Sequence, residues 1–139
     1  MDLDTRDLIE ERDNLKQQIL DSFLENFPHY EEMTESFEDI LFEEEEIQSW
    51  KEDWLDEIVE ITDIERLEDE ISSSEFDYGL LLIAEDDFEE YAEELVTDCG
   101  YISKDLPSWI EIDWKATANN VRQDYSEVDF RGTTYLYRA

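Results

Sequence analysis

Acidic side chains dominate this sequence to a degree that constrains any fold it adopts. The 139 residues include 43 Asp and Glu but only 10 Lys and Arg, which gives a formal net charge of -33. Mutual repulsion among so many carboxylates destabilises a compact state. A small domain needs a net charge of only about 2–8 in magnitude to stay in solution, so most of the excess requires another explanation.

Aromatic residues argue against disorder. Disordered acidic chains are poor in aromatic residues and cannot bury enough apolar surface to offset the entropy of ordering. This chain has 4 Trp, 7 Tyr and 7 Phe, with only 3 Gly and 2 Pro. We therefore expect it to fold, as one domain or as two small subdomains.

The charge also restricts the partners of the chain. Nucleic acids and anionic membranes attract Lys and Arg, so we expect the chain to bind neither. The partners that fit are basic: the DNA-binding groove of another protein, a basic protein, or a cloud of cations. No apolar run approaches the ~20 residues of a membrane span, the start of the chain has no cationic leader, and Cys99 is the only cysteine. We therefore expect a cytoplasmic protein.

The first half of the chain has helical periodicity. Apolar positions at three- to four-residue spacing predict a helix over residues 4–27, which Pro28 ends. Thr34 is a second candidate N-cap. A longer pattern follows, and its apolar stripe rotates near Thr62, so the helix either bends there or wraps a neighbour at a 3.5-residue period. The stripe consists of Ile47, Trp50, Trp54, Ile58, Ile61, Ile64, Leu67 and Ile71.

The three serines at 72–74 form the only break in composition. We therefore expect an acidic helical segment over residues 1–74 and a small module that contains both helices and strands over residues 75–139. This division predicts an α+β fold class for the whole chain.

Helices and strands alternate in the predicted module. Residues 78–84 form an apolar run that predicts a buried strand. Residues 86–99 predict an amphipathic helix that Gly100 ends, and residues 113–125 predict a second helix capped by its first residue. Two β-rich stretches on either side of Arg131-Gly132 predict a C-terminal hairpin.

Residues that could carry out chemistry are scarce. His29 is the only histidine and Cys99 the only cysteine, so the sequence predicts neither a catalytic triad nor a zinc site. It has no Gly-rich phosphate loop and no calcium-loop pattern. Carboxylate pairs occur throughout, so none of them singles out a glycosidase-type site. We expect no enzymatic activity, no metal and no cofactor; a small carboxylate-based enzyme is the least favoured alternative.

The informative feature is the arrangement of the acids. Residues 85–98 hold eight acids and no base, and residues 31–46 hold nine acids and no base. Exposed helices usually mix signs, because Glu–Lys pairs one turn apart stabilise a helix and like pairs destabilise it. The candidate partner-binding residues come from these two runs: Asp86, Asp87, Glu89, Glu90, Glu93, Glu94 and Asp98, together with Glu43, Glu44, Glu45 and Glu46.

Acids in this arrangement have the charge density of DNA. Duplex DNA carries about one charge per 1.7 Å of axis, so a net charge of -33 corresponds to about 16 base pairs. Carboxylates one helical turn apart lie about 5–6 Å from each other, close to the spacing of adjacent phosphates. A halophilic protein would spread its acids evenly, whereas here they gather in base-free runs.

The C-terminal part of the chain resembles a known family. The segments DFEEYAEEL at 87–95, IDW at 112–114 and DYS at 124–126, with the tail from Val128 to Arg138, resemble the ArdA-type antirestriction proteins of phages and mobile elements. Members of this family are elongated acidic dimers that mimic bent DNA and block type I restriction–modification enzymes. The resemblance implies that the acids of residues 86–98 belong to a mimic surface. The first 75 residues depart from the family, whose fuller members carry mixed α/β domains there.

We therefore predict an inhibitor that occupies the DNA-binding groove of a restriction–modification enzyme or of another defence enzyme. The alternative is an acidic helical adaptor that binds a basic protein through its apolar stripes. Because like-charged monomers can associate only where acids are sparse, we also expect a homodimer. Its candidate contacts are Trp109, Ile110, Ile112, Phe130, Tyr135 and Tyr137.

Overall fold

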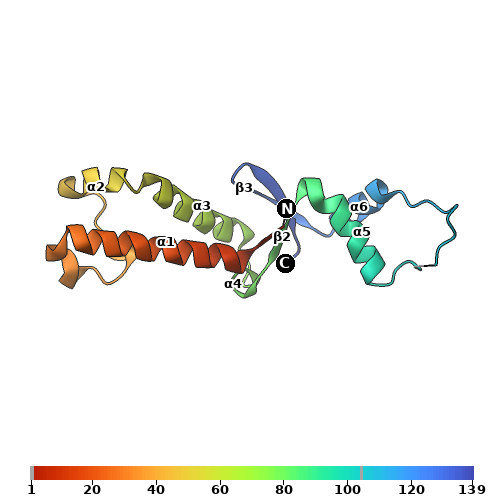
Figure 1. Ribbon diagram of the computed structural model, residues 1–139, viewed down its shortest axis with the longest axis horizontal. Coiled ribbons are helices and arrows are strands. Elements are labelled where there is room, and N and C mark those ends of the chain that lie inside the picture. The colour runs from red at the N-terminus through yellow and green to blue at the C-terminus, as the bar shows by residue number, and fades with distance from the viewer. Residues whose placement is uncertain (1, 104) are drawn as a thin grey trace. The chain divides into compact units, whose positions relative to one another are not determined.

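The chain forms two compact units in the computed structural model, which describes residues 2–103 and 105–139 (Figure 1). One unit is Asp7–Asp69; the other combines the residues up to Arg6 with Glu70–Ala139. Helices make up 61% of the structure, and the strands form a four-stranded antiparallel sheet, so the predicted α+β class is confirmed. The division differs from the expected boundary at residue 74, because the first residues of the chain belong to the sheet.

The helical unit contains two long helices and, between them, a segment of short helical turns. The helix predicted over residues 4–27 is confirmed as α1, Thr5–Asn26, and Pro28 begins the turn that follows it. The segment between the long helices contains 3-10 turns instead of a regular helix. The remaining elements are η1 (Pro28–Met33), η2 (Phe37–Asp39), η3 (Glu45–Ile47), α2 (Gln48–Glu52) and α3 (Leu55–Ile71).

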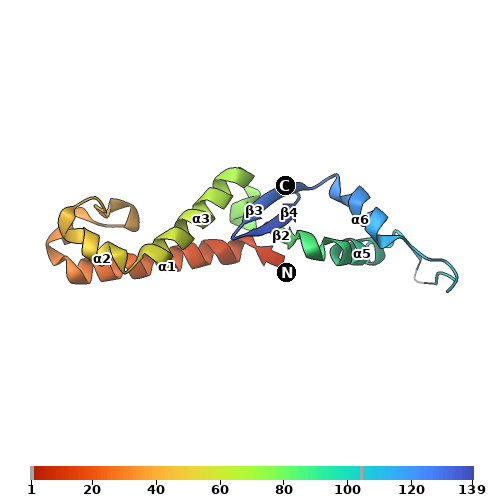
Figure 2. The same cartoon turned by 90° about the horizontal axis from the view of Figure 1, so that it is seen from above.

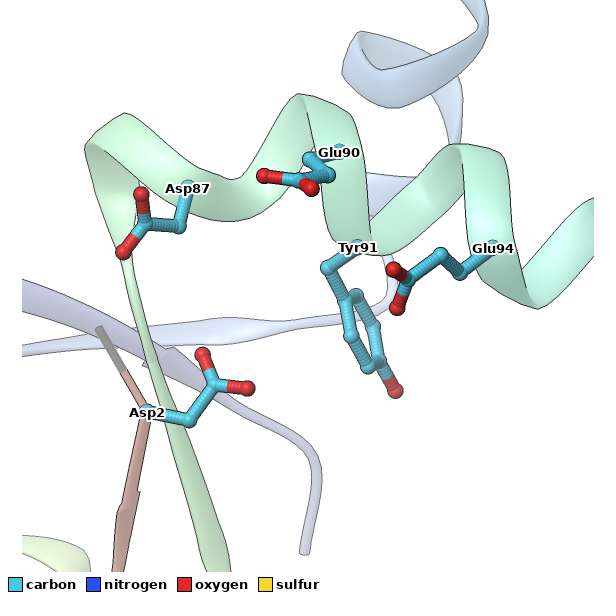
Figure 3. Close-up of a pocket in the computed structure, with 5 residues that line it drawn as sticks. All are labelled: Asp2, Asp87, Glu90, Tyr91 and Glu94. Atoms are coloured by element: carbon cyan, nitrogen blue, oxygen red, sulfur yellow. The ribbon is translucent and has the colours of Figure 1, made fainter.

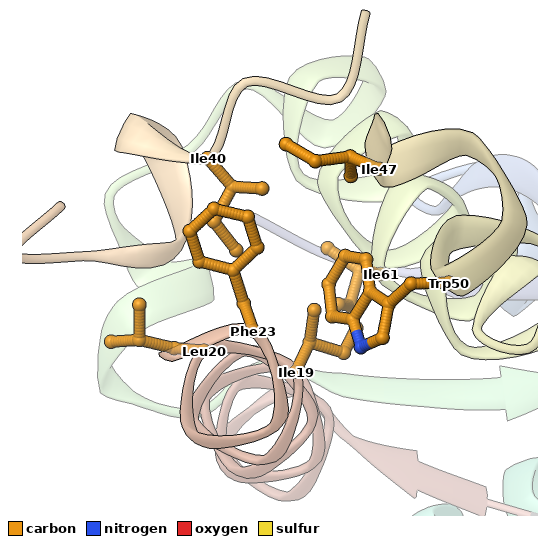
Figure 4. Close-up of a cluster of buried hydrophobic side chains, with 7 residues drawn as sticks. All are labelled: Ile19, Leu20, Phe23, Ile40, Ile47, Trp50 and Ile61. Atoms are coloured by element: carbon orange, nitrogen blue, oxygen red, sulfur yellow. The ribbon is translucent and has the colours of Figure 1, made fainter. Parts of the chain in front are cut away.

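The apolar stripe of the first half forms the core of this unit. Phe23 is fully buried at the centre of the cluster, and its ring lies 5.4 Å from that of Trp50 in an edge-on arrangement (Figure 4). The indole N–H of Trp50 donates a 2.9 Å hydrogen bond to Ser22 Oγ, which satisfies its only polar atom. The other buried members of the cluster are Ile19, Leu20, Ile40, Ile47 and Ile61.

The break in the second long helix lies at Asp53 and Trp54. The amides of these two residues bond to Trp50 and Lys51, three positions back, so the chain makes a tight turn between α2 and α3. Helix α3 then runs through Thr62, whose hydroxyl donates to the carbonyl of Ile58 at 2.9 Å. The helix therefore does not break at Thr62, and the threonine does not cap a new helix.

The sheet unit has the strand order β1-β2-β4-β3, with every pair antiparallel. The predicted C-terminal hairpin is confirmed as β3 and β4. Arg131 and Gly132 both have positive φ, 49° and 80°, the geometry that a two-residue hairpin turn prefers. The strands are β1 (Asp2–Asp4), β2 (Leu81–Ala84), β3 (Ser126–Phe130) and β4 (Thr133–Tyr137).

Strand β1 was not predicted. It pairs with β2 so that Asp2 faces Ile83 and Asp4 faces Leu81. The strand predicted over residues 78–84 begins only at Leu81, because Glu75–Tyr78 forms the short helix α4 and Gly79 follows it at a φ of 107°. The fully buried hydroxyl of Thr5 joins the start of α1 to the segment around α4. Thr5 Oγ1 donates to the carbonyl of Phe76 and accepts from the amide of Leu80, both at 2.7 Å.

Two helices complete the sheet unit. Helix α5 (Phe88–Asp98) follows the turn η4 (Glu85–Asp87), and α6 (Trp114–Arg122) packs beside it (Figure 2). Gly100 ends α5 at a φ of 74°, as predicted. Asp113 caps α6 by accepting a 3.0 Å hydrogen bond from the amide of Ala116, also as predicted, although the helix ends at Arg122 and not at Tyr125.

Candidate functional site

Helix α5 is held by one apolar face. Phe88 and Ala92 are buried in a cluster with Ile83, Leu136 and Ala118, which come from the sheet and from α6. Behind them, the ring of Tyr125 lies 5.1 Å from that of Phe88, and its hydroxyl is 3.1 Å from that of Tyr91. Burial, and then the Tyr91 hydroxyl, raise the pKa of Tyr125 well above its usual value, so the Tyr125 phenol stays neutral. The opposite face of the helix is therefore fixed in position.

The predicted acids lie on that opposite face and its flanks. Asp87 is half-buried, and the remaining six are exposed: Asp86, Glu89, Glu90, Glu93, Glu94 and Asp98. Five of the seven line two adjoining hollows along the helix, which share Glu90 and Glu94. The predicted residues of this run are thus brought together on η4 and α5, which follow one another directly.

The first hollow has a volume of about 280 Å³ and is lined by Asp2, Asp87, Glu90, Tyr91 and Glu94. In Figure 3 the carboxylates of Asp2 and Glu94 lie on either side of the Tyr91 ring. The second hollow, about 290 Å³, is lined by Glu90, Glu93, Glu94, Thr97 and Asp98. We call the two together the α5 acidic groove. Its walls offer carboxylates for a cation and one aromatic ring against which an ammonium or guanidinium group can pack.

Four acids of α5 have no basic partner among the described residues: Glu89, Glu90, Glu93 and Glu94. Arg122 pairs with Glu85 at 3.3 Å and also with Glu127. The guanidinium charge therefore lies beside the turn η4 that precedes α5. Hydrogen bonding to Glu127 raises the pKa of Arg122. Over residues 2–103 and 105–139, no ion pair reaches Glu89, Glu90, Glu93 or Glu94.

The second predicted run of acids lies in the helical unit. Glu43, Glu44, Glu45 and Glu46 are all exposed around the turn η3, next to the buried Ile47. Glu46 accepts a hydrogen bond from the Tyr30 hydroxyl and lies 3.3 Å from His29 Nε2. The Tyr30 bond lowers the pKa of Glu46, and the same bond raises the pKa of Tyr30 to about 12. Glu46 therefore also ties η3 to η1.

Sequence reasoning missed three residues of the groove: Asp2, Tyr91 and Thr97. Asp2 reaches it through strand β1, whose three residues are too few to produce a recognisable alternating pattern. Helical spacing places Tyr91 on the same face as Phe88 and Ala92, but its ring also forms a wall of the first hollow.

The predicted dimer contacts separate into buried and exposed residues. Phe130 and Tyr135 are 4% and 5% exposed and pack within their own unit, so the hairpin does not offer them to a second chain. Ile112 and Tyr137 are half-buried. Trp109 is 80% exposed and Ile110 is 40% exposed, and both lie in the loop between α5 and α6.

Comparisons with protein-family models, with curated proteins and with solved structures each found no match. Within the described parts of the chain, no helix has the length and apolar character needed to cross a membrane. Among the same residues, no group of three or more His, Cys, Asp and Glu side chains is placed to hold a metal ion. The geometry of the α5 acidic groove is therefore the main guide to function.

Proposed function

We propose that this chain is a DNA mimic that inhibits a DNA-binding enzyme by occupying its phosphate-binding groove. The observation that carries the proposal is the α5 acidic groove: carboxylates on a well-anchored helix, with no ion pair among the described residues reaching Glu89, Glu90, Glu93 or Glu94. The target class that we propose first is a type I restriction–modification enzyme, which is what the resemblance of the C-terminal part implies.

The groove can replace phosphates by simple electrostatics. A basic groove that binds DNA releases the counterions of the phosphates, and the affinity gained depends steeply on salt. Glu90 and Glu94 are one turn apart, about 5–6 Å, so neighbouring Lys or Arg side chains of the target can each meet a carboxylate. Because the helix is already fixed by its buried face, its backbone loses little conformational freedom on binding.

Burial of the apolar stripe supports this proposal over the adaptor alternative. An adaptor that binds through the stripe must leave it accessible, whereas Ile47, Trp50 and Ile61 are at most 9% exposed within the helical unit. Exposed carboxylates, by contrast, are available without any rearrangement.

A competition measurement tests the proposal. A labelled duplex that carries the recognition sequence is bound to a purified type I methyltransferase, and the chain is titrated in while fluorescence anisotropy is recorded. We expect displacement by the wild type and at least about tenfold weaker displacement by a variant with Glu89, Glu90, Glu93 and Glu94 changed to Gln.

A charge-matched control removes four exposed acids elsewhere. Glu52→Gln, Asp53→Asn, Asp56→Asn and Glu60→Gln change the net charge by the same amount outside the groove. This control should compete much better than the groove variant. Equal losses in the two variants would indicate attraction by net charge alone, and an inactive wild type would reject this target class.

A further inference from the structure

We propose that the loop between α5 and α6 places Trp109 in an apolar pocket beside the DNA-binding groove of the target, where enzymes that modify DNA hold an unstacked base. This inference rests on the proposed function and deepens it by assigning a second, apolar part to the contact.

Trp109 is the most exposed tryptophan of the chain. It is 80% exposed, whereas Trp50 is 9% exposed and Trp54 and Trp114 are half-buried. Tyr101, 78% exposed, lies in the same loop. Large aromatic side chains that are left in water this way are concentrated in binding surfaces, where they supply most of the affinity.

A tight turn presents the indole. The amide of Ile110 donates a 3.0 Å hydrogen bond to the carbonyl of Pro107, so Ser108 and Trp109 occupy the two corner positions. The loop is also fixed where it leaves the helix, because the amide of Tyr101 bonds to the carbonyl of Val96 at 3.1 Å. At its other end Asp113 caps α6.

Charge indicates what covers the loop. Residues 85–98 contain eight acids and no base, but residues 99–110 contain one of each, Asp105 and Lys104. These loop residues therefore carry no net charge. A partner that binds the α5 acidic groove through a basic surface can extend over the neighbouring loop without being repelled by it. The sequence also makes Trp109 and Ile110 candidate dimer contacts, but a second copy on this loop would bring its own α5 acids next to the first set, and like charges in close contact cost affinity.

The chemistry of DNA-modifying enzymes supplies a suitable pocket. Such enzymes extrude the target nucleotide and hold its base between aromatic or apolar side chains. Stacking of this kind requires only a flat π-face, and the fused rings of an indole provide one. Acids in the phosphate positions and an indole in the base position together reproduce both parts of the nucleic acid.

The test uses the full chain and a purified type I methyltransferase, at salt concentrations from about 0.05 to about 0.2 M. We expect Trp109→Ala to weaken binding by about 10- to 100-fold at every salt concentration, with the salt slope unchanged. Trp109→Phe keeps a π-face and should recover most of the loss. Tyr78→Ala is the matched control, because Tyr78 is 81% exposed but lies at the end of α4.

A double-mutant cycle identifies the pocket. If Trp109 fills the base pocket, replacing the base-stacking aromatic residue of the methyltransferase by Ala should weaken wild-type binding but leave the binding of Trp109→Ala unchanged. Independent, additive losses would overturn the assignment. So would wild-type affinity in Trp109→Ala, an equal loss in Tyr78→Ala, or a loss in Trp109→Ala that follows a change from dimer to monomer. Failure of the proposed function is distinct: the folded wild type would not bind at all, and the inference would fall with it.

Discussion

Lys16 on α1 lies 2.8 Å from Glu65 on α3, and the same ammonium lies 2.6 Å from Glu38 on η2. One turn earlier, Arg12 pairs with Glu68 of α3 at 2.9 Å. The pairing order shows that α1 and α3 run antiparallel. Bases are scarce in this chain, and these two join its helices to one another.

Replacing Lys16 by Met should destabilise the protein by about 1–2 kcal/mol, because Glu38 and Glu65 would then face each other without a cation. Burial alone would lower the pKa of Lys16, but its bonds to both carboxylates outweigh this and raise the pKa overall. Urea unfolding measures the change. Lys115→Met removes the same charge from an exposed position on α6 and should cost less; an equal or larger cost there would contradict the role of Lys16.

The contribution of Glu38 should depend on pH. Its hydrogen bond with Lys16 lowers its pKa below the ordinary value of 4.5, so the folded state binds the proton less tightly than the unfolded state. The stability from Glu38 is therefore present above pH 4.5 and is lost as the pH falls through its folded pKa.

Glu38→Gln should be less stable than the wild type at pH 7 by up to about 1 kcal/mol, a limit set by solvent screening. The difference in unfolding free energy should shrink as the pH falls below 4.5. Glu25→Gln, at an exposed position of α1, should show no such loss. A difference that persists unchanged at low pH would show that the charge of Glu38 does not matter.

Salt should stabilise the fold as a whole. The Debye length falls from about 30 Å at 0.01 M to about 3 Å at 1 M, so repulsion among the outer acids is screened. We expect the melting temperature to rise by about 5 °C or more. The groove variant with four Gln substitutions should show a smaller rise. A flat or falling melting temperature would indicate that the acids are already compensated.

The buried hydroxyl of Thr5 should matter more than its position near the chain start suggests. Thr5→Val keeps the shape but leaves the carbonyl of Phe76 and the amide of Leu80 without their partner, which should cost about 2–4 kcal/mol. Thr5→Ser retains the hydroxyl and should cost less. Hydrogen exchange at the Leu80 amide, slow in the wild type, should accelerate in Thr5→Val; equal losses in both variants would point to packing instead.

Tyr135→Glu should unfold the sheet unit and not merely separate a dimer. Tyr135 is 5% exposed, so a carboxylate there would be buried, at a cost of about 3 kcal/mol or more. Tyr101→Glu, at an exposed loop position, should change stability by no more than about 0.5 kcal/mol. Circular dichroism and denaturant unfolding compare the two; a stable, folded Tyr135→Glu protein would show that the hairpin face is accessible.

Local signals made much of the fold predictable. Pro28, Gly100, Asp113 and the Arg131-Gly132 turn each act through their own backbone preferences, and each lies where the sequence predicts. The acids of α5 were placed on one helix because the apolar residues beneath them recur at helical spacing.

Other features depend on contacts between distant residues. Strand β1 exists because β2 pairs with it, and a three-residue segment has no preference of its own that reveals this. The break at Asp53 and Trp54 lies inside a continuous helical pattern with no Gly or Pro to mark it. Burial of Tyr135 likewise follows from which face of the hairpin meets the core, which alternation alone does not decide.

Strand β1 has one more consequence, which concerns how the chain can be divided. The sheet contains residues from both ends of the sequence, so residues 7–69 are an insertion within the unit that surrounds them. A single cut cannot separate the two parts: a fragment that starts at residue 75 would lose β1, expose the edge of β2 and remove Asp2 from the groove. An exchange of the whole insertion between Arg6 and Glu70 would keep the strands in the same polypeptide. The helical part is therefore a cassette that can change in length and charge while α5 keeps its anchor.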